Sequence, residues 1–259
     1  MKKKLLFWLI AIPVLVFLIF TVGSIIFLEF FYTDTNEFPY TSWQPREGNY
    51  LFNPETVFDS LNDANLDEFT PTYITVYESP QIVPDGTINW TQSDFLMIAE
   101  TVNQKTWNDT LNNWEIYSLH YSAVCHENLI GFEESHIIYF KTQGDNKYSY
   151  TVREFFINPK IGLIEWGGGA HGSSHLFSHW KGINPNQPIE AEDVLRIAEE
   201  NGGKEFRSTL NNNCVIDLFL APENGYVLWM IDYTDINFQE YTVFSISVDP
   251  FTGKITRIW

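Results

Sequence analysis

The sequence predicts an α+β protein in which two tandem helix-plus-antiparallel-sheet modules follow an amino-terminal transmembrane helix. Three observations support this prediction. An apolar run without charge occupies residues 5–28. The segment 94–100 recurs at 193–199 with five identical residues in seven. After each copy come β-branched and aromatic stretches that end in turn signals containing Pro, which is typical of a helix followed by strands.

The run at 5–28 is long enough to cross a bilayer as a helix, because about 20 apolar residues span a hydrocarbon core of roughly 30 Å. Lysines occupy positions 2 to 4, and no Lys or Arg follows the run until Arg46. This asymmetry predicts that residues 1–4 are cytoplasmic and that the rest lies outside. A cleaved signal peptide is the alternative, but its apolar region would be shorter. We therefore expect a single-pass cell-membrane protein that contacts the lipid bilayer through 5–28.

The chain is strongly acidic. It has 33 Asp and Glu against 15 Lys and Arg, for a formal net charge of −18. Such a surface repels nucleic acid, so no nucleic-acid partner is expected. It favours cationic partners or serves solubility alone. The 259 residues, with 44% hydrophobic residues, are enough for one or two domains with a core.

The first part of the predicted external region, 29–89, is predicted to be a stalk and linker with one short helix. That helix would begin at Asn53, since Asn is a good cap and Pro54 suits the first turn. The first module is predicted at 90–166. Its helix would begin after Ser93. Four strand-like runs follow, at 115–124, 135–142, 148–157 and 161–166.

A Gly- and His-rich connector at 167–189 leads to the second predicted module at 190–259. The helix of this module would stop at 201–203, where Asn-Gly-Gly stands. Alternating strand-like runs follow it. They are expected at 215–220, 227–233, 244–248 and 255–259.

Two cysteines, Cys125 and Cys214, lie at similar distances before the closing prolines Pro159 and Pro250. A disulfide between them is permitted outside the cytoplasm. Two thiols buried in separate cores are an equal alternative. The sequence leaves both open.

Three segments of the second half together resemble a PepSY domain. They are 192–198 (EDVLRIA), 229–233 (WMIDY) and 244–255 (FSISVDPFTGKI). The resemblance covers about 190–259 well and 91–166 more loosely. It implies an extracytoplasmic domain that binds or restrains partners, notably peptidases, and has no catalytic residues of its own.

Three histidines, His171, His175 and His179, recur at every fourth position beside a run of glycines. On a helix they would share a face and could hold zinc or copper. The glycines and the absence of a His-Glu-x-x-His motif favour a flexible connector instead. We therefore expect no cofactor, and a metal site at 171–179 is the alternative.

The sequence also argues against an enzyme. Ser173 and Ser174 stand beside the histidines, but no Gly-x-Ser-x-Gly elbow is present and neighbours on a Gly-rich loop are not a positioned triad. Trp43, Trp107 and Trp180 lie near predicted loops and are candidates for aromatic binding at the surface.

Together these observations predict a membrane-anchored extracytoplasmic binding or regulatory module without catalytic activity, whose partner is a peptide, a peptidase or another envelope protein. Two alternatives stay open. One is a metal-binding protein or metal-dependent enzyme that uses 171–179. The other is a structural or carbohydrate-binding envelope protein that uses exposed aromatic residues.

Overall fold

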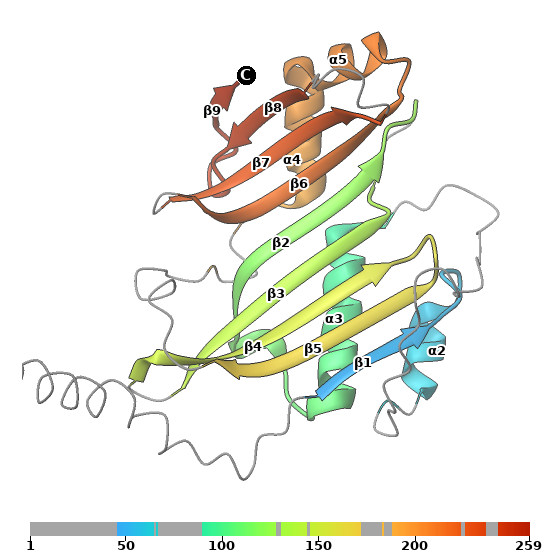
Figure 1. Cartoon of the computed structure of the whole chain (residues 1–259), viewed down its shortest axis with the longest axis vertical. Coiled ribbons are helices and arrows are strands. Elements are labelled where there is room, and N and C mark those ends of the chain that lie inside the picture. Colours follow the sequence, from blue (N-terminus) through green and yellow to red (C-terminus); the bar gives the residue numbers. More distant parts are fainter. Residues whose placement is uncertain are drawn as a thin grey trace, which may run out of the picture. The chain divides into compact units, whose positions relative to one another are not determined.

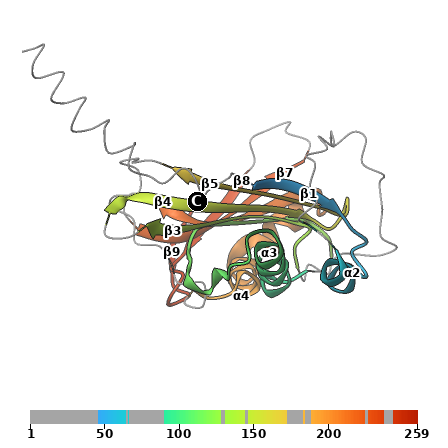
Figure 2. The ribbon, with the colours of Figure 1, turned by 90° about the horizontal axis from the view of Figure 1, so that it is seen from below.

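Nine strands form one antiparallel sheet, in the order β1-β5-β4-β3-β2-β6-β7-β8-β9 (Figure 1). They belong to one compact unit, Pro45–Trp259, of a computed structural model. The residues that the structure describes are 46–64, 66, 90–127, 131–143, 146–171, 183, 188–223, 226–236 and 243–259. Within that unit, helices α2, α3 and α4 lie on one face of the sheet (Figure 2).

The first half of the unit contributes five strands and two α-helices. Their bounds, in chain order, are β1 Arg46–Leu51, α2 Val57–Asp63, α3 Gln92–Trp107, β2 Glu115–Val124, β3 Glu134–Gln143, β4 Asn146–Asn158 and β5 Leu163–His171. The four strands after α3 were predicted within a few residues of these bounds. They are therefore confirmed as strands.

The second half contributes two α-helices and four strands. Their bounds are α4 Ala191–Ala198, α5 Lys204–Thr209, β6 Cys214–Glu223, β7 Tyr226–Asp235, β8 Val243–Val248 and β9 Ile255–Ile258. The predicted strands of this half are likewise confirmed.

The two halves share one sheet because β2 pairs with β6. The register runs from Leu119 opposite Leu220 to Val124 opposite Val215. The predicted fold class, two tandem PepSY-like helix-plus-antiparallel-sheet modules, is therefore wrong, because one nine-stranded antiparallel sheet runs through both halves. Its sequence signals are local, and they do not contain the pairing that makes the nine strands one sheet.

The predicted membrane protein is also not supported by the part of the chain that the structure describes. None of the helices there is long and apolar enough to cross a bilayer. The segment 5–28, on which that prediction rests, lies outside the described residues, as do 1–4 and most of 29–89.

Helix α3 begins two residues earlier than a cap at Ser93 predicts. Thr91 is the N-cap, and its Oγ1 accepts the backbone N–H of Asp94 while Asp94 Oδ2 accepts the backbone N–H of Thr91, at 3.3 and 2.8 Å. This capping box satisfies two donors at the helix start. The helix ends at Asn108, which adopts the left-handed conformation with φ 52°.

The Asn-Gly-Gly segment does not end the helical region of the second half but redirects it. Asn201 and Gly202 leave helical geometry, with φ of −116° and 119°. Only glycine adopts the second value without strain. The chain then resumes as α5, which packs Phe206 against Tyr233 and Phe244.

The core lies between the helices and the sheet. Alternate residues of each central strand are buried there, and the largest of these side chains include Tyr121, Trp229 and Tyr233. The remaining residues point to the other face, which none of the described helices covers. We call it the open face. On β2, β3 and β6 it carries Ser118, His120, Ser122, Glu134, His136, Ile138, Asp217 and Phe219.

Candidate functional site

Two histidines face each other across β2 and β3 at the centre of the open face. The register places His120 opposite His136, and directly opposed side chains of an antiparallel pair are close neighbours. On the next strand, β6, Phe219 lies opposite His120, and the two rings stack with centroids 4.1 Å apart. Strand pairing, rather than a loop, therefore positions both imidazoles.

Each imidazole contacts a carboxylate on a neighbouring strand. His120 Nε2 lies 2.9 Å from Asp217 Oδ1, and these side chains are 26% and 29% exposed. His136 Nε2 lies 2.5 Å from Glu154 Oε1, and that pair is more exposed, at 37% and 52%. Protonation of either histidine would place a cation beside a carboxylate.

A row of carboxylates crosses the sheet next to the histidines. In the register, Glu134 is opposite Ser122, Ser122 is opposite Asp217, and Asp217 is opposite Asp232. Ser245 Oγ donates a hydrogen bond of 2.5 Å to Asp232. Because like charges directly opposite one another repel, this row is stabilised by positive charge brought to the open face.

Burial raises the pKa of Glu134, and the Asp217 carboxylate acts in the same direction. His120 and His136 lower it, as does a hydrogen bond of 2.7 Å that Asn158 Nδ2 donates to Glu134 Oε2. A further cation near Glu134 would favour its ionised form. We call His120, His136, Glu134, Glu154, Asp217 and Asp232 the acid–imidazole cluster.

The side-chain partners of both histidines in the acid–imidazole cluster are carboxylates. A nucleophile needs a base within hydrogen-bond reach, but in the part of the chain that the structure describes no Ser or Cys side chain bonds to His120 or His136. Nor do the described residues contain a group of three or more His, Cys, Asp or Glu with the geometry of a metal site.

Half of the eight sequence-predicted site residues lie outside the described residues. This holds for Trp43, His175, His179 and Trp180, and only the backbone of His171, the last residue of β5, is described. A metal site at 171–179 thus stays a prediction.

Trp107, the last residue of α3, is half-buried. Its ring lies against the Arg153 guanidinium, 4.1 Å from the ring centroid, and meets Phe155 edge-on at 6.3 Å. The Trp107 side chain therefore contributes to helix–sheet packing.

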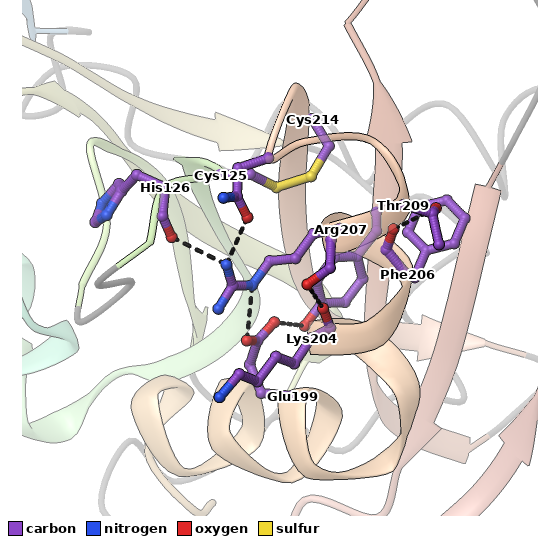
Figure 3. The surroundings of a disulfide bond; sticks show 11 residues. Cys125, His126, Glu199, Lys204, Phe206, Arg207, Thr209 and Cys214 are labelled. Atoms are coloured by element: carbon purple, nitrogen blue, oxygen red, sulfur yellow. Dashed lines mark hydrogen bonds and ion pairs between the residues drawn. A yellow bond between two sulfur atoms is a disulfide. The ribbon is translucent and has the colours of Figure 1, made fainter.

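Cys125 and Cys214 form a disulfide, with their Cα atoms 5.2 Å apart (Figure 3). They adjoin the paired ends of β2 and β6, where Cys125 N also donates to Cys214 O at 2.8 Å. The bond thus joins the two halves at the same place as the sheet does.

Beside the disulfide lies a buried ion pair (Figure 3). Arg207 Nε donates to Glu199 Oε2 at 2.8 Å, and the Tyr233 hydroxyl donates to Glu199 Oε1 at 2.9 Å. Arg207 Nη1 also donates to the His126 carbonyl and to Asn212 Oδ1, at 3.1 and 2.6 Å. These bonds satisfy most of a guanidinium that is almost fully buried, so the network is structural.

Sequence reasoning missed the acid–imidazole cluster. The signal that was available is period-two alternation, which places His120 on the polar face of one predicted strand and Asp217 on that of another. The two residues are 97 positions apart, and only the β2–β6 pairing brings them together.

Comparison with known proteins adds no assignment. No protein-family model matches the chain, and no curated protein does. Solved structures with a weak likeness include the 12:0-ACP thioesterase from Umbellularia californica, at 7% identity, with 82% of this chain and 94% of that chain covered and a TM-score of 0.22.

Two further structures show the same weak likeness. The acyl-CoA thioesterase II TesB2 from Mycobacterium marinum is 8% identical over 61% of this chain and 81% of its own, with a TM-score of 0.18. The dehydratase domain from the CurF module of curacin polyketide synthase is 10% identical over 82% and 90%, with a TM-score of 0.17. At these scores the likenesses carry no conclusion about fold or function.

Proposed function

We propose that this protein is a non-catalytic binding module that receives a positively charged segment of a partner protein on its open face. The observation that carries the proposal is the acid–imidazole cluster, in which four carboxylates and two histidines lie on five adjacent strands. A cationic segment laid across these strands would relieve repulsion between Asp217 and Asp232 and between Asp217 and Glu134.

The charge of the chain supports a cationic partner. A net charge of −18 draws cations toward the surface and accelerates their encounter with it. The cations nearest the open face are few among the described residues. Lys160 is paired with Glu133 at 3.1 Å, and Arg257 lies at the far edge, on β9.

The disulfide supports a location outside the cytoplasm. Cytosolic reductants keep thiols reduced, whereas disulfides persist in secreted, periplasmic and cell-surface proteins. We therefore place the binding module in an oxidising compartment. Aromatic and aliphatic side chains among the acids, such as Phe219 and Ile138, would add apolar contact to the charge recognition.

Fluorescence anisotropy with two labelled peptides tests the proposal. One decapeptide alternates Lys and Ser, and the other alternates Glu and Ser. The Lys peptide should bind more tightly, and more weakly as salt is raised, because exposed charge pairs are screened. Equal binding of the two peptides would refute the proposal.

A pair of matched variants localises the binding. The double variant Glu154→Gln with Asp232→Asn removes two negative charges from the open face. Both replacement side chains have nearly the same size as the originals and can still accept hydrogen bonds. Glu190→Gln with Glu205→Gln removes two charges from exposed positions in and beside α4 and α5. The first variant should bind the Lys peptide about fivefold more weakly than wild type, from roughly 0.5 kcal/mol per pair, and the second should lose less than twofold. Equal losses would mean that only net charge matters and would exclude the open face as the site.

A further inference from the structure

The last strand of the sheet, β9, is an edge strand among the described strands. It pairs with β8 on one side, and no strand of the described residues lies on its other side. An open edge presents backbone donors and acceptors that can pair with another chain.

The hydrogen bonds to β8 show which backbone groups face outward. Trp259 N donates to Ser245 O at 3.0 Å, and Ser245 N donates to Trp259 O at 2.9 Å. In an antiparallel pair, bonded and non-bonded residues alternate, so the N–H and C=O of Ile258 point away from β8. A register shift opposite Val248 leaves Thr256 as the extra residue of a bulge, with no register partner on β8, and its Oγ1 donates to Ser247 O at 3.2 Å.

The side chains at this edge are unusually apolar for the surface. Ile258 and Trp259 are 50% and 56% exposed, and Phe251, in the turn before β9, is 52% exposed. Natural edge strands are commonly protected by short length, bulges, Pro, Lys or inward charges; β9 is four residues long and carries a bulge, but it contains neither Pro nor Lys. By contrast, the opposite edge, β1, begins with Arg46 and Glu47.

The one charge on β9 is Arg257, an exposed side chain that lies over the Trp259 ring at 5.3 Å from its centroid. Arg257 forms no ion pair with a described residue. Lys254, in the turn before β9, is also exposed, but it lies near the Asp249 carboxylate, whose pKa it helps to lower. Arg257 therefore supplies the positive charge that β9 itself presents on a chain that is otherwise acidic.

We propose that the β9 edge accepts an extended, apolar-rich segment of a partner protein as a tenth strand, with an acidic side chain of that segment opposite Arg257. An incoming antiparallel strand would bond to Ile258, which leaves Arg257 in a non-bonded pair. In such pairs the Cα atoms are about 4.5 Å apart and side chains are closest, so the residue opposite Arg257 decides the match. Apolar side chains on either side of it would cover Ile258 and Trp259.

A second copy of this chain is the competing occupant. Two copies that each carry a charge of −18 repel one another, whereas a short partner segment with a single carboxylate does not face that repulsion. The proposal is independent of cation binding on the open face, since the two surfaces use different residues.

The test uses two labelled heptapeptides that alternate Val and Thr, with Glu at the centre of one and Lys at the centre of the other. Wild-type protein should bind the Glu peptide at least fivefold more tightly in fluorescence anisotropy. Arg257→Glu should reverse that preference. An unchanged preference in Arg257→Glu would overturn the proposal.

Backbone pairing is tested at Ile258. Ile258→Pro removes the outward N–H without removing a bond to β8, and Pro is tolerated on edge strands at such positions. It should weaken Glu-peptide binding at least tenfold, whereas Ile258→Val, which keeps the N–H, should bind as wild type does. Slower amide hydrogen exchange at Ile258 in the wild-type complex is expected in addition.

Analytical ultracentrifugation distinguishes a partner segment from a second copy of the chain at the β9 edge. A wild-type dimer that Ile258→Pro converts to a monomer would assign the edge to a second copy and overturn the proposed partner. A monomer at the concentrations of the binding assay, with exchange at Ile258 slowed only by the Glu peptide, supports it.

Discussion

Glu192 in the first turn of α4 accepts a hydrogen bond from the backbone N–H of Gln92, the first residue of α3, with 2.5 Å between the two atoms. In return, the Gln92 side-chain oxygen accepts the backbone N–H of Ala191 at 3.1 Å. The two helices that contain the repeated segments therefore cap each other at their amino ends. This exchange joins the halves in the helix layer, as β2 and β6 join them in the sheet.

The buried carboxyl of Glu192 should make stability depend on pH. Burial raises the pKa of Glu192 above its usual 4.5, Glu190 and Asp193 add to this, and the hydrogen bond from Gln92 N opposes it. The folded state thus holds this proton more tightly than the unfolded state. The resulting stabilisation is complete below the unfolded pKa and is lost as pH rises through the folded pKa.

We therefore expect the free energy of unfolding of wild type to fall relative to that of Glu192→Gln as pH rises above about 4.5. Gln keeps the acceptor for Gln92 N but does not ionise. Urea titrations of both proteins between about pH 4 and pH 8 measure the difference, and taking the difference cancels the other carboxyls. A difference that stays constant with pH would contradict this account of Glu192.

Arg207→Met should destabilise the protein strongly. The Glu199 carboxylate would be left largely buried without its cationic partner, which typically costs about 3–5 kcal/mol. Arg196→Met is the matched control, because Arg196 pairs with Asp193 and Glu200 at the exposed surface and its loss should leave stability nearly unchanged. Thermal unfolding by circular dichroism compares the two, and similar midpoints would rule out an important role for the buried pair.

Reduction of the disulfide should lower the free energy of unfolding while the protein stays folded. Cys125 and Cys214 are 89 residues apart, and closing a loop of that length stabilises the folded state by about 4.5 kcal/mol in the chain-entropy model. The double variant Cys125→Ser with Cys214→Ser should match reduced wild type in urea unfolding. Addition of a reductant to the variant should change nothing, and any shift there would point to another cause.

Gly203→Ala should be destabilising for lack of space. A Cβ atom at residue 203 would lie 2.4 Å from the Tyr233 hydroxyl oxygen and 3.0 Å from the Ala198 carbonyl oxygen. We expect a loss of about 1–3 kcal/mol, as for other overpacked sites. Gly167→Ala is the control, because nothing lies within 4 Å of its added Cβ. Equal unfolding midpoints for the two variants would show that Tyr233 moves aside freely.

Local patterns located most strands of this protein well, but not the helix starts: α2 begins at Val57 rather than at Asn53, and α3 begins at Gln92 rather than after Ser93. The alternating run at 115–124 coincides with β2, and the runs after it lie within β3 and β4. Side-chain alternation with period two is a property of the strand itself, so it is visible in a single segment. The sequence does contain a signal for the cap at Thr91, because Thr-x-x-Asp is a capping pattern, but Ser93 is an equally suitable cap residue two positions later.

The candidate site was not accessible in the same way. The strand pattern assigns His120 to a polar face, but it does not say which carboxylate will lie beside it. Asp217 reaches His120 because β6 pairs with β2 rather than with another strand. Similarly, the cysteines left two outcomes open until the ends of those two strands met.

The sequence by itself determined the charge, the strands that follow each repeated helix and the face to which their residues point, because these depend on neighbours along the chain. It did not predict β1, which lies in the predicted stalk and linker, or α5, which follows the predicted helix stop. The tertiary structure alone decided that nine strands share one sheet, that His120 meets Asp217 and that Gln92 caps α4. The physical reason is that partner choice between strands and helices depends on contacts between residues about 100 positions apart, and their energy appears only after the halves have docked.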